Sequence, residues 1–184
     1  MYHISQDVRA QKSAELLADG LVECSKSKTF DQITVSDISA VSTVSRATFY
    51  RLFDNTYDIL QYICDRDAEE VFSHTDIIAS KGLKYFILNF LSGLMEHRQF
   101  VSLLAESNHL DMIRIAHEKY YDKIRVVVDQ GINDQDIADY IVEAMASALP
   151  SMLRVWVMHG EKETPEELYN LSKKSLNFVV GLFE

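Results

Sequence analysis

The chain has few residues that break helices or cross-link a fold. Its 184 residues include six Gly, two Pro and two Cys. So few Gly and Pro exclude long structureless loops and a β fold with many tight turns. Two cysteines exclude a disulfide framework. Cys24 and Cys64 fall on separate predicted helices. We expect both to be small buried apolar residues, and the alternative is that they form a redox sensor.

Targeting and membrane segments are also missing from the sequence. No run reaches the roughly 18 apolar residues that a spanning helix needs, so we expect none. The first residues, MYHISQDVRAQKSAELL, do not show the basic start and apolar block of a signal peptide. We therefore expect a cytoplasmic protein with no membrane partner.

The sequence lacks an excess of basic charge as well. Its net charge is −10. Residues 1–65 carry six Lys or Arg against nine Asp or Glu, which gives −3, and residues 66–184 carry the other −7. Because neutralisation of phosphates supplies most non-specific affinity for DNA, this chain should bind random DNA weakly.

Helical periodicity runs through almost the whole sequence, and 47% of the residues are hydrophobic. The length is enough for one domain or two closely packed small ones. We therefore predict an all-α fold, because no strand pattern interrupts the three- and four-residue apolar spacing. The predicted helices cover about 7–27, 35–41, 45–53, 77–96, 97–107, 111–130 and 134–159, with one more capped by Asn55 and a last one capped by Thr164.

Helix starts and breaks are marked by particular residues. Thr34 with Asp37 has the spacing of a capping box. The string Thr164-Pro165-Glu166-Glu167 combines a cap, a first-position proline and a glutamate three residues after the cap. Pro150 should kink the helix around it, and Gly131 should end the helix before it.

The most informative segment is TVSDISAVSTVSRATFYRLF at residues 34–53. It predicts two short helices joined by a tight turn, which is the layout of a helix-turn-helix. The second helix has a polar and basic front edge formed by Ser45, Arg46 and Thr48. Helical periodicity alone would instead favour the alternative that the aromatic residues of FYRLF, at 49–53, only form a stripe that packs in the core.

The segment resembles the TetR family of bacterial transcription regulators. The resemblance rests on TVSDI at 34–38, VSRATFYRLF at 44–53 and YDIL at 57–60. It implies an all-α protein with an N-terminal three-helix DNA-binding domain, residues 1–63, and a C-terminal helical domain for effector binding and dimerisation, residues 64–184.

The same resemblance implies roles for single residues. Arg46 and Ala47 would lie nearest the base edges, and Arg46 would donate hydrogen bonds to guanine. Hydroxyl groups beside them would hold phosphates, which fix register rather than sequence, while Ile38, Val44 and Phe49 anchor the core. The residues expected to contact DNA are Thr34, Ser36, Ser45, Arg46, Ala47, Thr48, Tyr50, Arg51, Asn55 and Thr56.

Three positions depart from the family pattern. Thr43 replaces the glycine of the turn, Leu52 replaces a histidine near the end of the second helix, and Thr56 replaces a lysine. The family's histidine and lysine contact phosphate, so we expect lower affinity and a flatter salt dependence.

The C-terminal half contains no sharp motif, and its roles are implied by the resemblance. An aromatic stretch would line a cavity for a small-molecule effector that the sequence does not identify. Core packing without a cavity is the alternative. The candidate pocket residues are Tyr85, Phe86, Asn89, Phe90, Phe100 and Leu104.

The last two predicted helices resemble the family's dimerisation helices. Two copies would form a four-helix bundle in a homodimer. The alternative is that these residues pack helices together within one chain only. The candidate interface residues are Met145, Leu149, Met152, Trp156, Leu171, Ser175, Phe178 and Leu182.

No pattern in the sequence indicates catalysis or a bound cofactor. His97, His109 and His117 do not form a metal-ligand set, and no nucleophile or phosphate-loop signature is present. The resemblance to the TetR family implies a ligand-responsive, homodimeric repressor that binds a near-palindromic double-stranded DNA operator. The alternative is a TetR-like coactivator or adaptor that acts through a protein partner with weak DNA binding of its own.

Overall fold

A computed structural model describes residues 1–73, 81–129 and 134–181. As predicted, the described chain is all-α, and its regular elements are helices. These are α1 (Val8–Cys24), the short 3-10 helix η1 (Phe30–Gln32), α2 (Val35–Ser42), α3 (Arg46–Leu52), α4 (Thr56–Ser73), α6 (Leu83–Glu96), α7 (Arg98–Glu106), α8 (Asp111–Glu118), α9 (Tyr121–Asp129), α10 (Gln135–Met158) and α11 (Pro165–Gly181).

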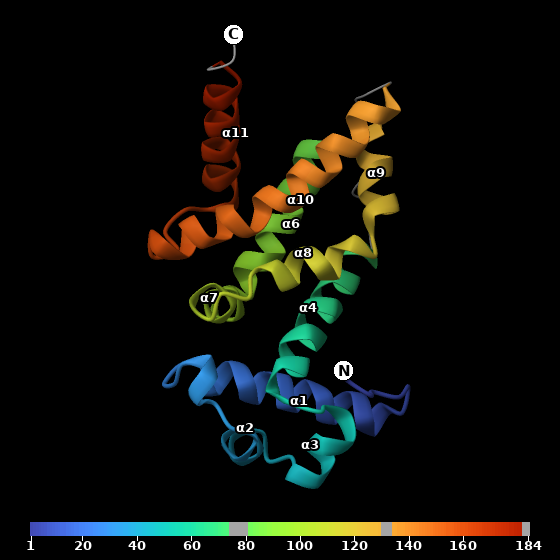
Figure 1. The fold of residues 1–184 in the computed structure, drawn as a ribbon, viewed down its shortest axis with the longest axis vertical. Helices are drawn as coiled ribbons and strands as arrows, with labels where there is room; N and C mark the ends of the chain where they lie inside the picture. Colours follow the sequence, from blue (N-terminus) through green and yellow to red (C-terminus); the bar gives the residue numbers. More distant parts are fainter. Residues whose placement is uncertain (74–80, 130–133, 182–184) are drawn as a thin grey trace.

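The first three helices form a small unit at one end of the molecule, and α4 leads from them into the remaining helices (Figure 1). The early part of α4 packs on α1 and its later part on α8. The domain boundary predicted at residues 63 and 64 falls inside this continuous helix. α4 is therefore the helix that belongs to both halves and joins them along the chain.

The unit of α1 to α3 has a core of fully buried apolar side chains. Leu17 and Leu21 of α1 meet Ile38 of α2 and Phe49 of α3, and each of the four has 0% exposure. Gly20 lies at a close approach of α1 and α2, since a Cβ there would sit 3.0 Å from Ser42 Cβ. Removing this apolar surface from water is the main force that holds the short helices together.

The predicted helix starts are present as hydrogen bonds. Asp37 N donates to Thr34 Oγ1 at 3.2 Å, and Thr34 N donates to Asp37 Oδ2 at 2.9 Å, which completes the capping box of α2. Thr164 and Glu167 make the same reciprocal pair at the start of α11. Ser45 caps α3 by accepting from Thr48 N at 3.1 Å.

Several predicted boundaries are wrong. α1 ends at Cys24 rather than at residue 27, and the described part of the helix predicted at 77–96 begins only at Leu83, after Gly82 with φ +87°. The helix predicted at 111–130 is broken into α8 and α9. At the break, Tyr120 stacks on Phe72 of α4 with ring centroids 4.6 Å apart, so a tertiary contact overrides local helical periodicity. Gly131 lies outside the described residues.

α10 is the longest described helix, and it runs as one element through Pro150. Against expectation, its segment Ile137–Met158 is long and apolar enough to cross a membrane, judged by length and composition alone. The helix packs against α7, α8 and α9, yet only 22% of that segment is buried. Its exposed large apolar side chains are Ile137, Tyr140, Val155 and Met158.

Both cysteines are free and buried. Burial raises the pKa of the Cys24 thiol and of the Cys64 thiol. A thiol that stays protonated is a poor nucleophile, so the structure favours two apolar core residues over a redox sensor.

Candidate nucleic-acid interface and ligand pocket

The turn between α2 and α3 is made by a residue in the left-handed conformation. Thr43 follows α2 with φ +60° and ψ +8°. A β-branched residue is strained there by roughly 1–2 kcal/mol, which a glycine would avoid. Val44 N donates to Ser42 Oγ at 3.3 Å, and this bond helps to hold the turn closed. Position 43 therefore has a positive φ, and Thr43 adopts it at a cost in strain.

α3 divides its residues sharply between two faces. Phe49 and Leu52 are buried, at 0% and 2% exposure, while Arg46, Tyr50 and Arg51 are exposed. Position 52 thus faces the core. Leu52 therefore offers no group to a phosphate.

The residues predicted to contact DNA share one property: none is buried. Their side chains come from the start of α2, from α3 with its cap, and from the start of α4. Asn55 caps α4, with its Oδ1 accepting from Asp58 N at 3.0 Å. Exposed are Thr34, Ser36, Ser45, Arg46, Ala47, Tyr50, Arg51 and Asn55, and half-buried are Thr48 and Thr56.

This surface carries little free positive charge. Arg46 and Arg51 are its only basic side chains among the ten predicted contacts. Lys28, in the connection before α2, is paired with Asp37 at 2.7 Å. That pair and the bonds to Thr34 lower the pKa of the Asp37 carboxyl, so this negative charge persists at the edge of the surface.

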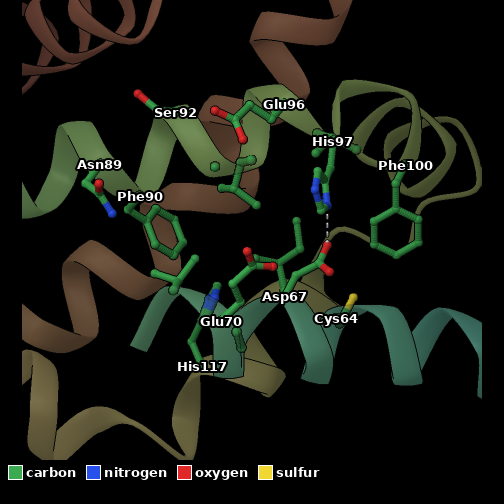
Figure 2. A pocket seen from close by; sticks show the side chains of 16 residues that line it. Cys64, Asp67, Glu70, Asn89, Phe90, Ser92, Glu96, His97, Phe100 and His117 are labelled. Carbon is green, nitrogen blue, oxygen red and sulfur yellow. Dashed lines mark hydrogen bonds and ion pairs between the residues drawn. The ribbon is translucent and has the colours of Figure 1, made fainter. Parts of the chain in front are cut away.

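A pocket of about 400 Å³ lies between α4 and α6, and we call it the α4–α6 pocket (Figure 2). α7 and α8 supply the rest of its wall. Its lining residues are Cys64, Asp67, Ala68, Glu70, Val71, Asn89, Phe90, Ser92, Gly93, Leu94, Glu96, His97, Phe100, Val101, Ile113 and His117.

Two histidines in the pocket have opposite electrostatic surroundings. His97 lies at its mouth, with Nδ1 2.8 Å from Asp67 Oδ2, and this hydrogen bond raises the pKa of His97. His117 on α8 is 6% exposed, and burial lowers its pKa to about 4. The mouth is therefore able to hold a charged imidazole, while the floor is neutral at pH 7.

A second cavity of about 480 Å³ opens between α6, α10 and α11, and we call it the α10–α11 groove. Its lining is mostly apolar, with Met145, Leu149 and Met152 from α10. It shares Phe90 and His117 with the α4–α6 pocket. These two side chains therefore separate the two cavities.

The fold resembles those of solved transcription regulators. The dihydroxyacetone kinase operon activator DhaS superposes with a TM-score of 0.64 at 23% identity, over 92% of this chain and 95% of that chain. A TetR transcriptional regulator from Streptococcus agalactiae 2603V superposes with a TM-score of 0.61 at 16% identity, over 90% and 94% of the two chains. The fold is TetR-like. No family model matches it.

Two further similarities extend over nearly the whole chain. A protein from Listeria innocua superposes with a TM-score of 0.68 at 16% identity, over 96% of both chains. In sequence, the HTH-type dhaKLM operon transcriptional activator DhaS of Lactococcus lactis subsp. lactis (strain IL1403) is 25% identical over 176 residues, 92% of this chain and 91% of the relative. The relative from L. lactis is described as a transcriptional activator.

The predicted effector residues are only partly brought together. Asn89, Phe90 and Phe100 line the α4–α6 pocket, and Phe86 lines the α10–α11 groove together with Phe90. Tyr85 is 40% exposed and lies outside both linings, and Leu104 is fully buried in the core, also outside them.

The predicted interface residues fall into three groups. Leu171, Ser175 and Phe178 of α11 are exposed, while Met145, Leu149 and Met152 of α10 are half-buried along the groove. Trp156 is 2% exposed, and its Nε1 donates to Glu163 O at 3.1 Å, so it packs inside its own chain. Leu182 lies outside the described residues.

The sequence prediction missed the pocket residues of α4 and α8. Asp67, Glu70 and His117 are far apart along the chain, and no local motif joins them. Among the described residues, no group of three or more His, Cys, Asp or Glu side chains is placed to hold a metal ion. Only the crossing of α4, α6 and α8 brings these three side chains to one cavity.

Proposed function

We propose that this TetR-like chain is a homodimeric transcription regulator that binds operator DNA through α3 and responds to a small molecule. The observation that carries this proposal is the exposed edge of α3. Arg46, Ala47 and Tyr50 point outward from a helix whose opposite side, Phe49 and Leu52, is buried. This division leaves the outer side free to enter a major groove.

A second copy of the chain would place two such helices on one duplex. The exposed apolar side chains of α10 and α11 support an isologous pairing, because such a surface on a water-soluble chain costs free energy unless it is covered. Successive major grooves on one side of DNA are about 34 Å apart. A two-fold dimer therefore predicts a near-palindromic operator.

The position of α4 supports control by a ligand. The helix leaves α3 through Asn55 and then lines the α4–α6 pocket with Asp67 and Glu70. A ligand that favours one placement of α4 would shift the balance between two spacings of the α3 helices. The coupling is the difference in ligand affinity between those two arrangements.

A histidine joins the two halves at a second point. The ring of His109, just before α8, meets Phe30 at 5.4 Å and Tyr57 at 5.1 Å, both edge-on. α8 ends next to His117, which lines the pocket. Movement at the pocket would therefore reach the helix-turn-helix through α8 as well as through α4.

The test is binding to the DNA upstream of the protein's own gene. Arg46→Ala should weaken specific binding by about 1–3 kcal/mol, since one good side-chain contact to a base pair is worth this much. The dimer should stay folded. Arg98→Ala removes an exposed arginine from α7 and serves as the matched control. Unchanged binding by Arg46→Ala in a mobility-shift assay would refute the assignment of α3.

An adaptor with weak DNA affinity of its own is the second candidate, favoured by the acidic composition and by the pairing of Lys28 with Asp37. The same assay at low salt separates the two candidates. Nanomolar binding by the purified chain excludes the adaptor, and no binding below micromolar concentration supports it. Repression stays a prediction, and the L. lactis relative, described as an activator, supports the opposite output. A reporter gene behind the operator distinguishes these two outputs.

A further inference from the structure

The α4–α6 pocket is lined by carboxylates that ion pairs neutralise only in part. Its lining contains Asp67, Glu70 and Glu96 and no Lys or Arg. Asp67 is already bonded to Arg66 and to His97, each at 2.8 Å. Glu70 and Glu96 are exposed and form no ion pair with any described residue. Figure 2 shows their carboxylates entering the pocket from α4 and α6.

The floor of the pocket is formed by the largely buried side chain of His117. The ring nitrogens of His117 make no hydrogen bond to any residue in the described ranges, although the side chain is more than nine-tenths buried. Its ring contacts are to Phe72 and Phe90, at 5.4 and 4.9 Å. In Figure 2 the imidazole points from α8 toward the cavity, below Phe90 and Glu70. A polar group of this kind is normally completed by water or a ligand.

The neutral state of His117 matters for the sign of the ligand's charge. Its pKa of about 4 keeps the ring uncharged at pH 7, so it does not repel a cation and one ring nitrogen accepts a hydrogen bond. The walls beside it are the aromatic rings of Phe90 and Phe100. Aromatic faces near carboxylates are favourable surroundings for an ammonium group.

We propose that the α4–α6 pocket binds an organic cation, with its ammonium group beside Glu70 and Glu96 and its apolar body between Phe90, Phe100 and His117. This inference rests on the proposed function, because it names the chemical class of the effector. The volume of about 400 Å³ suits a small molecule rather than a peptide. The α10–α11 groove has Lys173 and no carboxylate in its lining, so a cation has an electrostatic reason to choose the α4–α6 pocket.

The test compares three probes of one shape and different charge on the purified full chain. 4-Phenylbutylamine is a cation at pH 7, 4-phenylbutanol is neutral and 4-phenylbutyrate is an anion. Calorimetry should show the amine binding about tenfold more tightly than the alcohol, with the butyrate weakest. Equal affinities, tighter binding of the butyrate, or no binding of the amine at millimolar concentration would each overturn the proposal.

Variants locate the charge that discriminates between the probes. Glu70→Gln combined with Glu96→Gln should remove the preference for the amine and leave the affinity of the alcohol unchanged. Glu69→Gln removes one charge from the same helix at a residue outside the pocket lining, and it should leave the preference intact. A preference that survives the double substitution would overturn the placement beside Glu70 and Glu96.

Failure of this inference can be distinguished from failure of the proposed function. The probe comparison is made without DNA, and the mobility-shift assay is made without probes. A chain that binds its operator but does not prefer the amine is a regulator with a different effector. A chain that prefers the amine but binds no operator retains the cation site and loses the proposed DNA role.

Discussion

His117 shows how one side chain takes its properties from three elements. It belongs to α8, yet its ring lies against Phe72 of α4 and Phe90 of α6. Those contacts remove the ring from water and hold it neutral. In the sequence it is one of six histidines, and nothing local distinguishes it from the exposed His159.

The stability of the fold should fall with acid partly because of this residue. The pKa of His117 is about 4 in the folded chain and about 6.5 when unfolded. Between these values the unfolded chain binds a proton that the folded chain does not. This part of the stability is therefore complete above pH 6.5 and is lost as the pH falls toward 4, by roughly 3 kcal/mol in all.

His117→Phe should remove that pH dependence. The measurement is the free energy of unfolding in urea between pH 7 and pH 4 for both chains. Phe90→Leu disturbs the same aromatic cluster but keeps the imidazole, so it should lower stability at every pH and keep the wild-type slope. A parallel loss of stability in His117→Phe and wild type would contradict the assignment.

At the scale of elements, the short helices depend on close contact. α2 and α3 have eight and seven residues, too few to be stable alone in water. Their caps fix where they begin, and burial against α1 fixes how they lie. The crossing of α1 and α2 at Gly20 is the tightest of these contacts at a described glycine, with Ser42 Cβ 3.0 Å and Ile38 O 3.2 Å from a Cβ placed there.

Gly20→Ala should therefore destabilise the chain by about 1–3 kcal/mol, because an added methyl group forces α2 away from α1. Alanine's higher helix propensity does not offset this strain. Gly93→Ala is the matched control on α6, where the nearest atom to the new Cβ is Val71 Cγ2 at 3.7 Å. It should stabilise the chain by up to about 1 kcal/mol. Thermal unfolding measures both variants, and equal effects would show that the crossing is looser than the structure indicates.

At the scale of the whole molecule, the last two helices expose large apolar side chains to solvent. Val155 and Met158 of α10 are 47% and 77% exposed, and Leu176 and Phe178 of α11 are 60% and 70% exposed. α11 packs mainly on α6 and stands at the end of the molecule away from α1 to α3 (Figure 1). A second copy that covers these side chains would leave the two α3 helices free at the other end.

Phe178→Glu should convert the proposed dimer into a monomer, because a buried unpaired charge at an interface costs several kcal/mol. Val126→Glu is the matched control, since Val126 is also exposed, at 56%, but lies on α9. Sedimentation at micromolar concentration measures the mass of each variant. A wild-type chain that sediments as a monomer would contradict the dimer directly, as would a dimer that tolerates Phe178→Glu.

The sequence by itself determined the all-α class and the helix starts at Thr34, Ser45 and Thr164. These depend on hydrogen bonds and periodicities within a few residues, so local sequence contains them.

Only the tertiary structure decided where helices break or face a neighbour. Tyr120 stacks on Phe72 where α8 gives way to α9, and Leu52 lies in the core because α3 packs on α1. The α4–α6 pocket could not be predicted from local sequence either. Glu70, Glu96 and His117 acquire a shared role only when helices from three parts of the chain cross, since burial and electrostatic fields depend on neighbours in space rather than in sequence.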